Sequence, residues 1–593
     1  MKKQIKFVSI SNHVMGGQWL PAASANIISH LIKDDYIKEN YNFLDIEFQN
    51  DCLDSKKFIA DLNVADMLCI TNYVWNQSLN DSISNMFKII NPDGIVVYGG
   101  PNVPKFNRDI IEFVETRDYV DYFFTGAGEK TFKEFLINGT SNIKNGYYCH
   151  DTYKEFNHHD VNYNELQLSA SEYPMPSYDG LYDHILNEKK YDRIGLPVET
   201  TRGCPYSCSF CDWGGQSNGK VVKFDDKSVV DEIKNVIKND SVKYIDFCDA
   251  NYGIYERDIE IIKQICLNKN KVISVSFSGV AKNGSKHVDE IYSLVKDNFS
   301  LILNETKISL QTMDANTLEI NKRSNISTVK LLKQMDSLDN PVRAAELIIG
   351  LPGETGDTWA ETIFNTAGIG FTSLKIHRLV LSPNILLNDP EFQLKHNIKP
   401  VEVQIPRLFL STNHIGHLEE KGIDTETFKI NDGIFEKFNT IASCDSFDVE
   451  EIVKMHHVTL WYKLFIESKF LLPAIGTISP DTLRYNYELF KDNINNMNFI
   501  NSIFQEALSS IRNTFSKDKI TLNSLKDSNY FLYIISSEKY HIVKNFDKVK
   551  KELQLIYPDE SFDYLDKIQK KLLDDNDKSW KVYKLKSPYA LKQ

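Results

Sequence analysis

The chain has 593 residues, of which 42% are hydrophobic and 25% charged, and its formal net charge is −13. A chain of this length exceeds a single core, so we expect about three or four domains. The acidic balance argues against a nucleic-acid binder, because phosphate contact needs a basic face. No apolar run is long enough to cross a bilayer, so we expect no membrane span.

Residues 1 to about 140 alternate short β-rich runs with amphipathic stretches. The runs are residues 6–10, 43–48, 66–71, 95–98 and 122–125, with helices expected over 22–33 and 79–90. This order predicts an α/β fold with a doubly wound, Rossmann-like parallel sheet, which binds ligands at the carboxyl ends of its strands. Glycine-containing loops follow several strands, and glycine lets the backbone approach a large flat ligand closely.

Three of these loops carry recognisable motifs. Residues 73–76 read Tyr-Val-Trp-Asn, residues 99–101 read Gly-Gly-Pro, and residues 121–132 contain Gly-Ala-Gly-Glu. They resemble a family of cobalamin-binding domains, whose versions read close to Y-x-W-N, GGP and D-x-x-x-x-G-E-G-E-x-T-F; Ala127 replaces the usual acidic residue. The alternative is a Rossmann-like domain that binds no corrinoid. The resemblance implies cobalamin contacts from Tyr73, Trp75, Asn76, Gly99, Gly100, Gly126, Gly128 and Glu129.

One histidine of this domain is a candidate cobalt ligand. Some cobalamin proteins ligate cobalt through the histidine of a D-x-H-x-x-G loop, and here residues 11–16 read Ser-Asn-His-Val-Met-Gly. Ser11 is a weaker partner than aspartate for orienting a ligating imidazole. We therefore expect His13 to be an ordinary loop histidine, with cobalt ligation as the alternative.

Residues 141–192 are rich in Asn, Asp, His and Tyr, and we expect a linker there. The loop that follows it carries three cysteines, Cys204, Cys208 and Cys211, at a C-x3-C-x2-C spacing. Three thiolates this close together can hold three irons of a cubane and leave the fourth iron open. A zinc site is the alternative, but structural zinc normally takes four protein ligands, and no fourth Cys or His lies nearby.

The cysteine loop resembles the signature of the radical S-adenosylmethionine (SAM) superfamily, in which SAM chelates the open iron. The nine cysteines are otherwise scattered, so no disulfide framework is expected. Together with an oxygen-sensitive cluster, this favours a reducing cytoplasm as the location.

Six strands are expected in order after the linker. They cover residues 195–200, 243–248, 272–278, 307–311, 343–349 and 373–379, with helical stretches between them. This repeat predicts a central partial (β/α)6, TIM-like barrel over residues 193–389, whose active site is built by loops at the carboxyl ends of the strands. The cysteine loop follows the first of these strands, as that architecture requires.

Other residues at these strand ends are candidates for SAM contacts by the same resemblance. The second strand is followed by Asp249 and Asn251, where relatives bind the methionine amine, although an acidic residue there also caps helices. The fifth leads into Ile-Ile-Gly-Leu-Pro-Gly-Glu-Thr at 348–355, which matches the family element that approaches adenine. The remaining candidates are Ser309, Gln311, Arg323, Ile348 and Gly350.

Residues 390–593 turn helical and aromatic-rich, and we expect a mainly helical domain that contributes to substrate binding. The resemblance as a whole implies a cobalamin-dependent radical SAM enzyme with one [4Fe-4S] cluster, SAM and cobalamin. The reaction that the resemblance implies is C-methylation: a 5′-deoxyadenosyl radical abstracts hydrogen from an unactivated carbon, which then receives methyl from methylcobalamin. The alternatives are a non-methylating rearrangement, cyclisation or ring contraction, or a corrinoid-binding sensor or carrier. The expected partners are a small-molecule, natural-product or peptide substrate and an electron donor such as flavodoxin or ferredoxin.

Overall fold

The computed structural model divides into two compact units. The first comprises Met1–Asn304, Leu381–Phe392 and Ile434–Phe438, and the second comprises Glu305–Val380, Gln393–Gly433 and Asn439–Gln593. The structure describes all residues except 11–17, 50–54, 140–142, 189–190, 192, 214–219, 280–285, 300–304, 325–341, 407–434, 517–518, 522–541, 543–544 and 568–593. His13 therefore lies outside the described residues.

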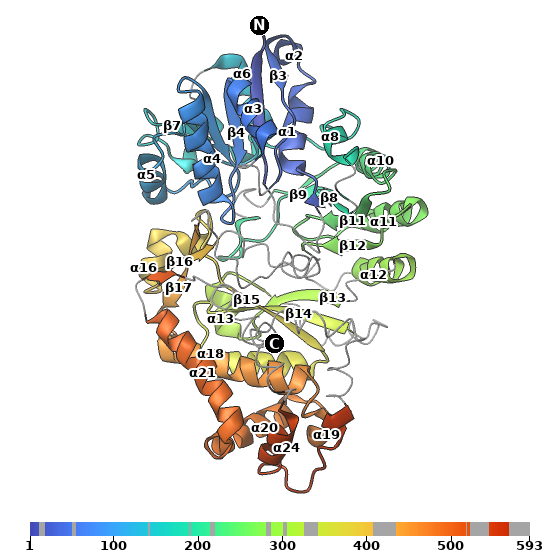
Figure 1. Ribbon diagram of the computed structural model, residues 1–593, viewed down its shortest axis with the longest axis vertical. Coiled ribbons are helices and arrows are strands. Elements are labelled where there is room, and N and C mark those ends of the chain that lie inside the picture. Colours follow the sequence, from blue (N-terminus) through green and yellow to red (C-terminus); the bar gives the residue numbers. More distant parts are fainter. Residues whose placement is uncertain are drawn as a thin grey trace. The chain divides into compact units, whose positions relative to one another are not determined.

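The first unit begins with a six-stranded sheet of order β3-β1-β4-β5-β6-β7 (Figure 1). Neighbouring strands are parallel except for β6 and β7, which are antiparallel. The doubly wound parallel sheet expected from the sequence is thus confirmed. The strands are β1 (Lys3–Val8), β3 (Tyr41–Phe43), β4 (Met67–Thr71), β5 (Ile95–Gly99), β6 (Tyr122–Phe124) and β7 (Tyr147–Cys149).

Both faces of this sheet are buried, because successive residues of a strand point to opposite sides. In β4, Met67 and Cys69 enter one hydrophobic core, while Leu68 and Ile70 enter the other. Residues of α1 and α6 join the first core, and residues of α3, α4 and α5 join the second. The helices of this region are α1 (Ala22–Leu31), α2 (Asp35–Asn40), α3 (Lys56–Val64), α4 (Gln77–Ile90), α5 (Asn107–Glu115) and α6 (Gly128–Asn138).

Strand β7 lies in the stretch that we expected to be a linker. Its ring partners explain why it forms: Tyr147 stacks on Phe124 with centroids 4.6 Å apart, and Tyr148 stacks on Phe123 at 5.4 Å. Cross-strand aromatic pairs of this kind stabilise an edge strand. The same stretch also contains the short helices α7 (Tyr163–Leu166) and α8 (Asp183–Leu186).

A second sheet of the first unit has the order β12-β11-β8-β2, and all of its pairs are parallel. Its first three strands are the first three expected barrel strands, each followed by a helix. Strand β2 was not expected. A Cβ added at Gly195 of β8 would lie 2.4 Å from the Trp19 ring, so only a glycine at this position lets the Trp19 side chain of β2 pack against β8. The elements are β2 (Gln18–Trp19), β8 (Ile194–Val198), α10 (Asp226–Val236), β11 (Val242–Phe247), α11 (Arg257–Asn268), β12 (Ser274–Phe277) and α12 (Lys286–Asn298).

The second unit holds the other three expected barrel strands as a parallel sheet of order β13-β14-β15. The bounds are β13 (Glu305–Gln311), α13 (Ala315–Ile320), β14 (Val342–Ile349), α15 (Gly356–Gly368) and β15 (Ser373–Arg378). Helix α15 begins at a capping box, in which the Thr355 side chain accepts from the backbone N–H of Thr358 while the Thr358 hydroxyl oxygen accepts from the backbone N–H of Thr355.

The later part of the chain is mainly helical, as expected, but it also contributes a small sheet of order β17-β16-β18. The helices are α16 (Pro390–Lys395), α18 (Val449–Trp461), α19 (Leu472–Ile475), α20 (Pro480–Asn493), α21 (Asn498–Phe515) and α24 (Phe546–Leu553), and a π-helical turn covers Tyr462–Glu467. The strands are β16 (Lys399–Pro406), β17 (Phe435–Ser443) and β18 (Lys519–Thr521).

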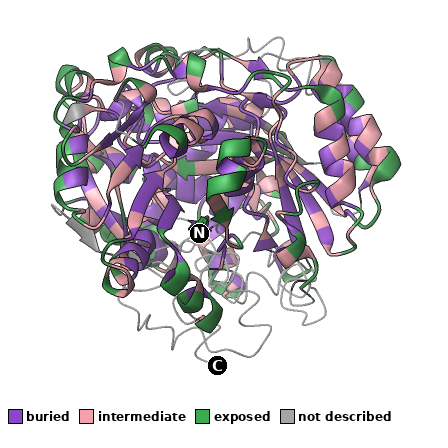
Figure 2. Cartoon of the chain, turned by 90° about the horizontal axis from the view of Figure 1, so that it is seen from above, coloured by how far each residue is buried: buried purple, intermediate pink, exposed green. Residues whose placement is uncertain are grey.

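Burial follows the elements closely. Figure 2 shows buried residues along the strands and exposed residues on the outer faces of helices. Among the helices that the structure describes, none has the length and hydropathy needed to cross a membrane.

Candidate functional site

The cysteine loop leaves the second sheet of the first unit through a two-stranded ribbon. Strand β9 (Thr201–Arg202) pairs antiparallel with β10 (Val222–Lys223), which closes the base of the loop. Gly203 follows with φ +96°, a conformation that glycine adopts without strain. Cys204 and Cys208 are buried and Cys211 is half-buried. The loop therefore carries its thiols on a fixed base.

The three thiols are not in disulfide bonds. Among the described residues, no three His, Cys, Asp or Glu side chains converge closely enough to hold a single metal ion. A cubane does not need such convergence, because each thiolate ligates its own iron and the three sulfurs stay apart. The donor set of Cys204, Cys208 and Cys211 on one short loop fits a cluster of this kind.

Asp249, at the end of β11, anchors the start of the cysteine loop. Its carboxylate accepts from the backbone N–H and the hydroxyl of both Thr200 and Thr201, at 2.5–3.1 Å. Burial raises the pKa of Asp249 to about 7, against the effect of these hydrogen bonds. The sequence suggested a SAM contact or a helix cap for this residue; in the structure its carboxylate lies against the two threonines.

Asn251 lies two residues further and is buried. Its Nδ2 donates to the Cys204 Sγ at 3.1 Å, and its buried Oδ1 has no hydrogen-bond partner. A buried carbonyl oxygen without a donor is uncommon and points to a missing ligand. An ammonium group, as in the methionine part of SAM, fits this acceptor. Asn251 stays a candidate SAM contact.

Arg202 links the cysteine loop to the first turn of α6. Its guanidinium donates to both carboxylate oxygens of Glu129, at 2.9 and 3.1 Å, and also to Glu199. Burial alone would raise the pKa of Glu129, but the Arg202 charge holds it below the usual value. Such a two-pronged pair fixes orientation as well as distance. Glu129, expected to contact cobalamin, is thus bound to the base of the cysteine loop.

The loop after β4 contains the aromatic pair expected to contact cobalamin. The Tyr73 and Trp75 rings stack with centroids 4.5 Å apart and planes 12° from parallel. Asn76 shapes the loop: its Oδ1 accepts from the Tyr73 N–H at 2.8 Å, and its Nδ2 donates to the Ile10 carbonyl at 2.9 Å. Burial, with the charges of Cys248 and Glu199 nearby, raises the pKa of Tyr73 to about 12. The loop therefore lies close to the carboxyl end of β11.

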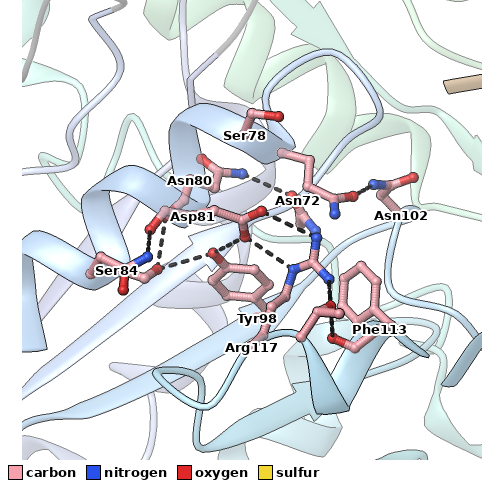
Figure 3. Close-up of polar contacts among 12 residues, drawn as sticks. Asn72, Ser78, Asn80, Asp81, Ser84, Tyr98, Asn102, Phe113 and Arg117 are labelled. Atoms are coloured by element: carbon pink, nitrogen blue, oxygen red, sulfur yellow. Dashed lines mark hydrogen bonds and ion pairs between the residues drawn. The ribbon is translucent and has the colours of Figure 1, made fainter. Parts of the chain in front are cut away.

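Two donors of this region lack partners. Asn72 Nδ2 and Trp75 Nε1 are both buried without a hydrogen bond. The Asn72 oxygen, by contrast, accepts from Asn80 of α4 at 3.0 Å, within the polar network drawn in Figure 3. The carboxamide side chains of a corrin offer carbonyl acceptors for such donors. The polar atoms at this loop therefore fit cobalamin.

Behind this loop, α4 is held by a network of charged and polar side chains. Asp81 receives hydrogen bonds from the Tyr98 hydroxyl at 2.9 Å and from Arg117 at 3.0 and 3.1 Å (Figure 3). Glu436 of β17, which is fully buried, accepts from the backbone N–H groups of Ser78 and Leu79 at the first turn of α4. A carboxylate at this end also interacts favourably with the helix dipole.

The glycines of the other two loops are in contact mainly with protein atoms. A Cβ at Gly100, where φ is +102°, would lie 2.7 Å from the Asn72 carbonyl oxygen. At Gly126 it would meet the Tyr163 ring at 2.7 Å, and at Gly128 the Ile27 side chain at 2.9 Å. At Gly99 it would meet only the Phe124 Cβ at 3.9 Å, so Gly99 leaves the most space. Their predicted roles at cobalamin stay predictions.

The sequence did not single out Asn384 as a structural residue of this site. Its Oδ1 accepts from the Lys105 N–H at 2.9 Å, and its Nδ2 donates to the carbonyls of Pro101 and Val103 at 2.8 and 2.9 Å. These bonds clamp the loop that begins with Gly99.

In the second unit, three candidate SAM contacts gather around β13. Gln311 has φ +70°, and its buried Oε1 has no hydrogen-bond partner. The Ser309 hydroxyl donates to Glu346 at 2.5 Å, while the Arg323 guanidinium donates to the Ser309 carbonyl. Arg323 is buried rather than on the surface. The Gln311 oxygen fits a donor of SAM, and the three assignments stay predictions.

The end of β14 carries the remaining two candidates. Ile348 is half-buried and pairs in register with His377 of β15. Gly350 has φ +86°, and an added Cβ would meet only the Phe447 ring at 4.0 Å, which leaves space beside its backbone. Arg378, at the end of β15, packs over the Phe515 ring at 3.8 Å and therefore stabilises the second unit.

Comparisons with known proteins agree with this geometry. Residues 198–364 match the family model described as the radical SAM superfamily. The cobalamin-dependent radical SAM methyltransferase TokK of Streptomyces tokunonensis is 29% identical over 419 residues, which cover 67% of this chain and 58% of TokK. The 2-(S-pantetheinyl)-carbapenam-3-carboxylate methyltransferase of Streptantibioticus cattleyicolor is 29% identical over 392 residues, covering 63% of this chain and 55% of that enzyme.

The chain thus spans little more than half the length of these curated relatives. Among solved structures, that of the cobalamin-dependent SAM radical enzyme OxsB with aqua-cobalamin bound has a TM-score of 0.50 at 14% identity. The match covers 100% of this chain and 83% of OxsB. This likeness concerns the fold.

Proposed function

We propose that the chain is a cobalamin-dependent radical SAM enzyme and that it acts as a C-methyltransferase. It transfers a methyl group to an unactivated carbon of its substrate. The observation that carries the proposal is the link between two loops of the first unit. Arg202, two residues before Cys204, binds Glu129 in the first turn of α6, and Tyr73 lies near Cys248 at the end of β11.

Three cofactors are part of the proposal. One [4Fe-4S] cluster is held by Cys204, Cys208 and Cys211, and SAM binds beside it. Cobalamin is held by the loops that follow the strands of the first sheet, with Tyr73 and Trp75 as contacts. Bound there, the cluster and SAM supply a 5′-deoxyadenosyl radical, and cobalamin supplies the methyl group.

The task of the protein itself is to orient these groups and to exclude water. Asp249 fixes the base of the cysteine loop through four hydrogen bonds, and Arg202 fixes that base against the first turn of α6. Asn76 and Asn384 hold the loops at the carboxyl edge of the first sheet. Preorganised loops of this kind spend little binding energy on ordering when the cofactors bind.

The domain assignments follow from the same proposal. Residues 1–140 bind cobalamin, 141–192 connect the domains, 193–389 form the radical SAM domain and 390–593 contribute to substrate binding. The substrate that we propose is a small-molecule natural-product precursor, as is the carbapenam named for the Streptantibioticus cattleyicolor relative. A one-electron donor such as flavodoxin or ferredoxin completes the system.

Mass spectrometry of a reconstituted anaerobic reaction tests this function. The protein is supplied with iron, sulfide, cobalamin, SAM and a reductant, and it is incubated with a panel of natural-product, peptide and lipid precursors. A methyltransferase yields a product heavier by one CH2 group, together with 5′-deoxyadenosine and S-adenosylhomocysteine. A product without added carbon would instead establish a rearrangement or cyclisation. No SAM cleavage by the reduced protein would favour a corrinoid sensor or carrier.

A further inference from the structure

The amide of Asn251 touches one of the cysteines assigned to the cluster. Its Nδ2 lies 3.1 Å from the Cys204 Sγ, and both residues are buried, with 5% and 4% of their surface exposed. An amide N–H is a full donor, whereas a thiolate sulfur is a weak acceptor that carries negative charge. In a site with little water, such a charge-assisted bond has a larger effect than at the surface.

The backbone around Asn251 is fixed on both sides. Asp249 is bound to Thr200 and Thr201, and the Tyr252 N–H donates to the Gly279 carbonyl at 2.9 Å. A Cβ at Gly279 would lie only 2.5 Å from the Ala250 carbonyl oxygen, so the two loops are in direct contact. The amide is therefore held in place by its neighbours and needs no bound ligand to point at the sulfur.

We propose that Asn251 is a positioning residue that raises the reduction potential of the cluster through its N–H···S bond to Cys204. This inference rests on the proposed function, since it requires a cluster on the three cysteines. When the cluster accepts one electron from its donor, negative charge on the irons and sulfurs increases. A donor aimed at a ligand sulfur stabilises the reduced form more than the oxidised form, and hydrogen bonds to the sulfurs are among the factors that set such potentials.

The second polar atom of the same side chain is consistent with this role. The Asn251 Oδ1 has no hydrogen-bond partner, so the amide is not needed to satisfy another protein group. Its N–H is directed to the sulfur. One side chain then serves two purposes: the nitrogen acts on the cluster, and the oxygen remains for the predicted SAM amine.

An anaerobic redox titration followed by electron paramagnetic resonance tests the proposal. The midpoint potential of the full-length, reconstituted protein is measured without SAM for the wild type, Asn251→Leu and Asn251→Asp. Leu keeps the approximate volume but removes the donor, and Asp removes the donor and adds negative charge. We expect a more negative potential for Leu and a still more negative one for Asp. Asn91→Leu is the matched control, because Asn91 Nδ2 donates to the Ala65 carbonyl far from the cysteine loop.

The outcomes separate this inference from the proposed function. Absence of a cubane signal in the wild type would refute the cluster itself. A wild-type cluster with unchanged potentials in both Asn251 variants would overturn the inference and leave the proposed function intact. Loss of iron and sulfide in both variants would also overturn it, since Asn251 would then hold the loop together rather than tune the cluster. An equal shift in Asn91→Leu would assign the effect to general destabilisation.

Discussion

The cysteine loop and the loop after β4 belong to the same unit, yet their polar groups are satisfied differently. At the cysteine loop, the Asp249 carboxylate and the Arg202 guanidinium are saturated by protein partners. At the loop after β4, the donors of Asn72 and Trp75 are buried without partners. The base of the first loop is thus held by protein partners alone, although the Asn251 Oδ1 next to Cys204 has no partner. The second is completed only by a ligand with acceptors, which is what a corrin provides.

The largest expected effect comes from the thiols. Replacing Cys204, Cys208 and Cys211 together with Ala should abolish cluster assembly, because three of the four irons of the cubane then lose their protein ligands. Iron and sulfide analysis with the visible absorption spectrum measures the loss, and SAM cleavage should disappear with it. Cys266→Ser, on α11, is the control and should keep the cluster. Retention of iron and sulfide in the triple variant would refute the assignment of these ligands.

Arg202→Gln should have the next largest effect, because it leaves the buried Glu129 carboxylate uncompensated. Breaking a buried pair from one side costs about 3 kcal/mol. Denaturant unfolding measures this loss, and Arg202→Gln combined with Glu129→Gln should recover part of it. Arg202→Lys tests the geometry, since Lys keeps the positive charge but cannot form the two parallel hydrogen bonds to one carboxylate. If Arg202→Gln were as stable as the wild type, the pair would not hold the two loops together.

Because Glu436 holds the first turn of α4, its titration should make the free energy of unfolding depend on pH. Burial raises the pKa of this carboxyl to about 7, whereas it is about 4.3 in an unfolded chain. Between these two pH values the folded state holds a proton that the unfolded state has released, so this group's contribution to stability is lost as the pH rises through 7.

Glu436→Gln removes that proton exchange. We expect the variant to lose less stability than the wild type between pH 5 and pH 8, by about 2 kcal/mol. Urea unfolding at both pH values measures the difference, and Glu155→Gln at an exposed position is the control. Parallel pH profiles for the wild type and Glu436→Gln would contradict the raised pKa.

The smallest effect that we predict concerns the loop after β4. Trp75→Glu places a charge where an apolar ring stacks on Tyr73, and it should weaken cobalamin binding about tenfold, equivalent to about 1.4 kcal/mol. The iron content should not change, because Asp249 and Arg202 hold the base of the cysteine loop without any contact from Trp75. A spectroscopic titration with hydroxocobalamin measures the affinity. Tyr73→Phe keeps the stack and should bind like the wild type; equal binding by Trp75→Glu would remove the loop from the cobalamin site.

Local pattern was enough to predict most strands of both sheets. The run expected over residues 243–248 is β11 at Val242–Phe247, and the run over 95–98 is β5 at Ile95–Gly99. Helix α10 begins after Asp225, whose side chain accepts from the Ser228 N–H. These elements are set by short-range hydrophobic periodicity and capping, which a sequence displays directly.

Strands β2, β7 and β16 to β18 were not predicted, because each is stabilised by partners distant along the chain. The two residues of β2 form a strand only against Ile194 and Gly195. Such short runs carry too little periodicity of their own, so tertiary pairing decides them.

The printed sequence was enough to indicate the candidate cofactor sites, since the spacing of three cysteines and the motif loops after the strands are local properties. It also indicated which residues lie at the carboxyl ends of those strands. Only the tertiary structure decided which of them are bound to protein and which are left for a ligand. Glu129 and Arg202, which form an ion pair, are 73 residues apart in the chain. The Asn76 amide binds the Ile10 carbonyl, and the Asn251 amide binds the Cys204 sulfur. Hydrogen-bond partners that distant are selected by packing, and no local pattern encodes them.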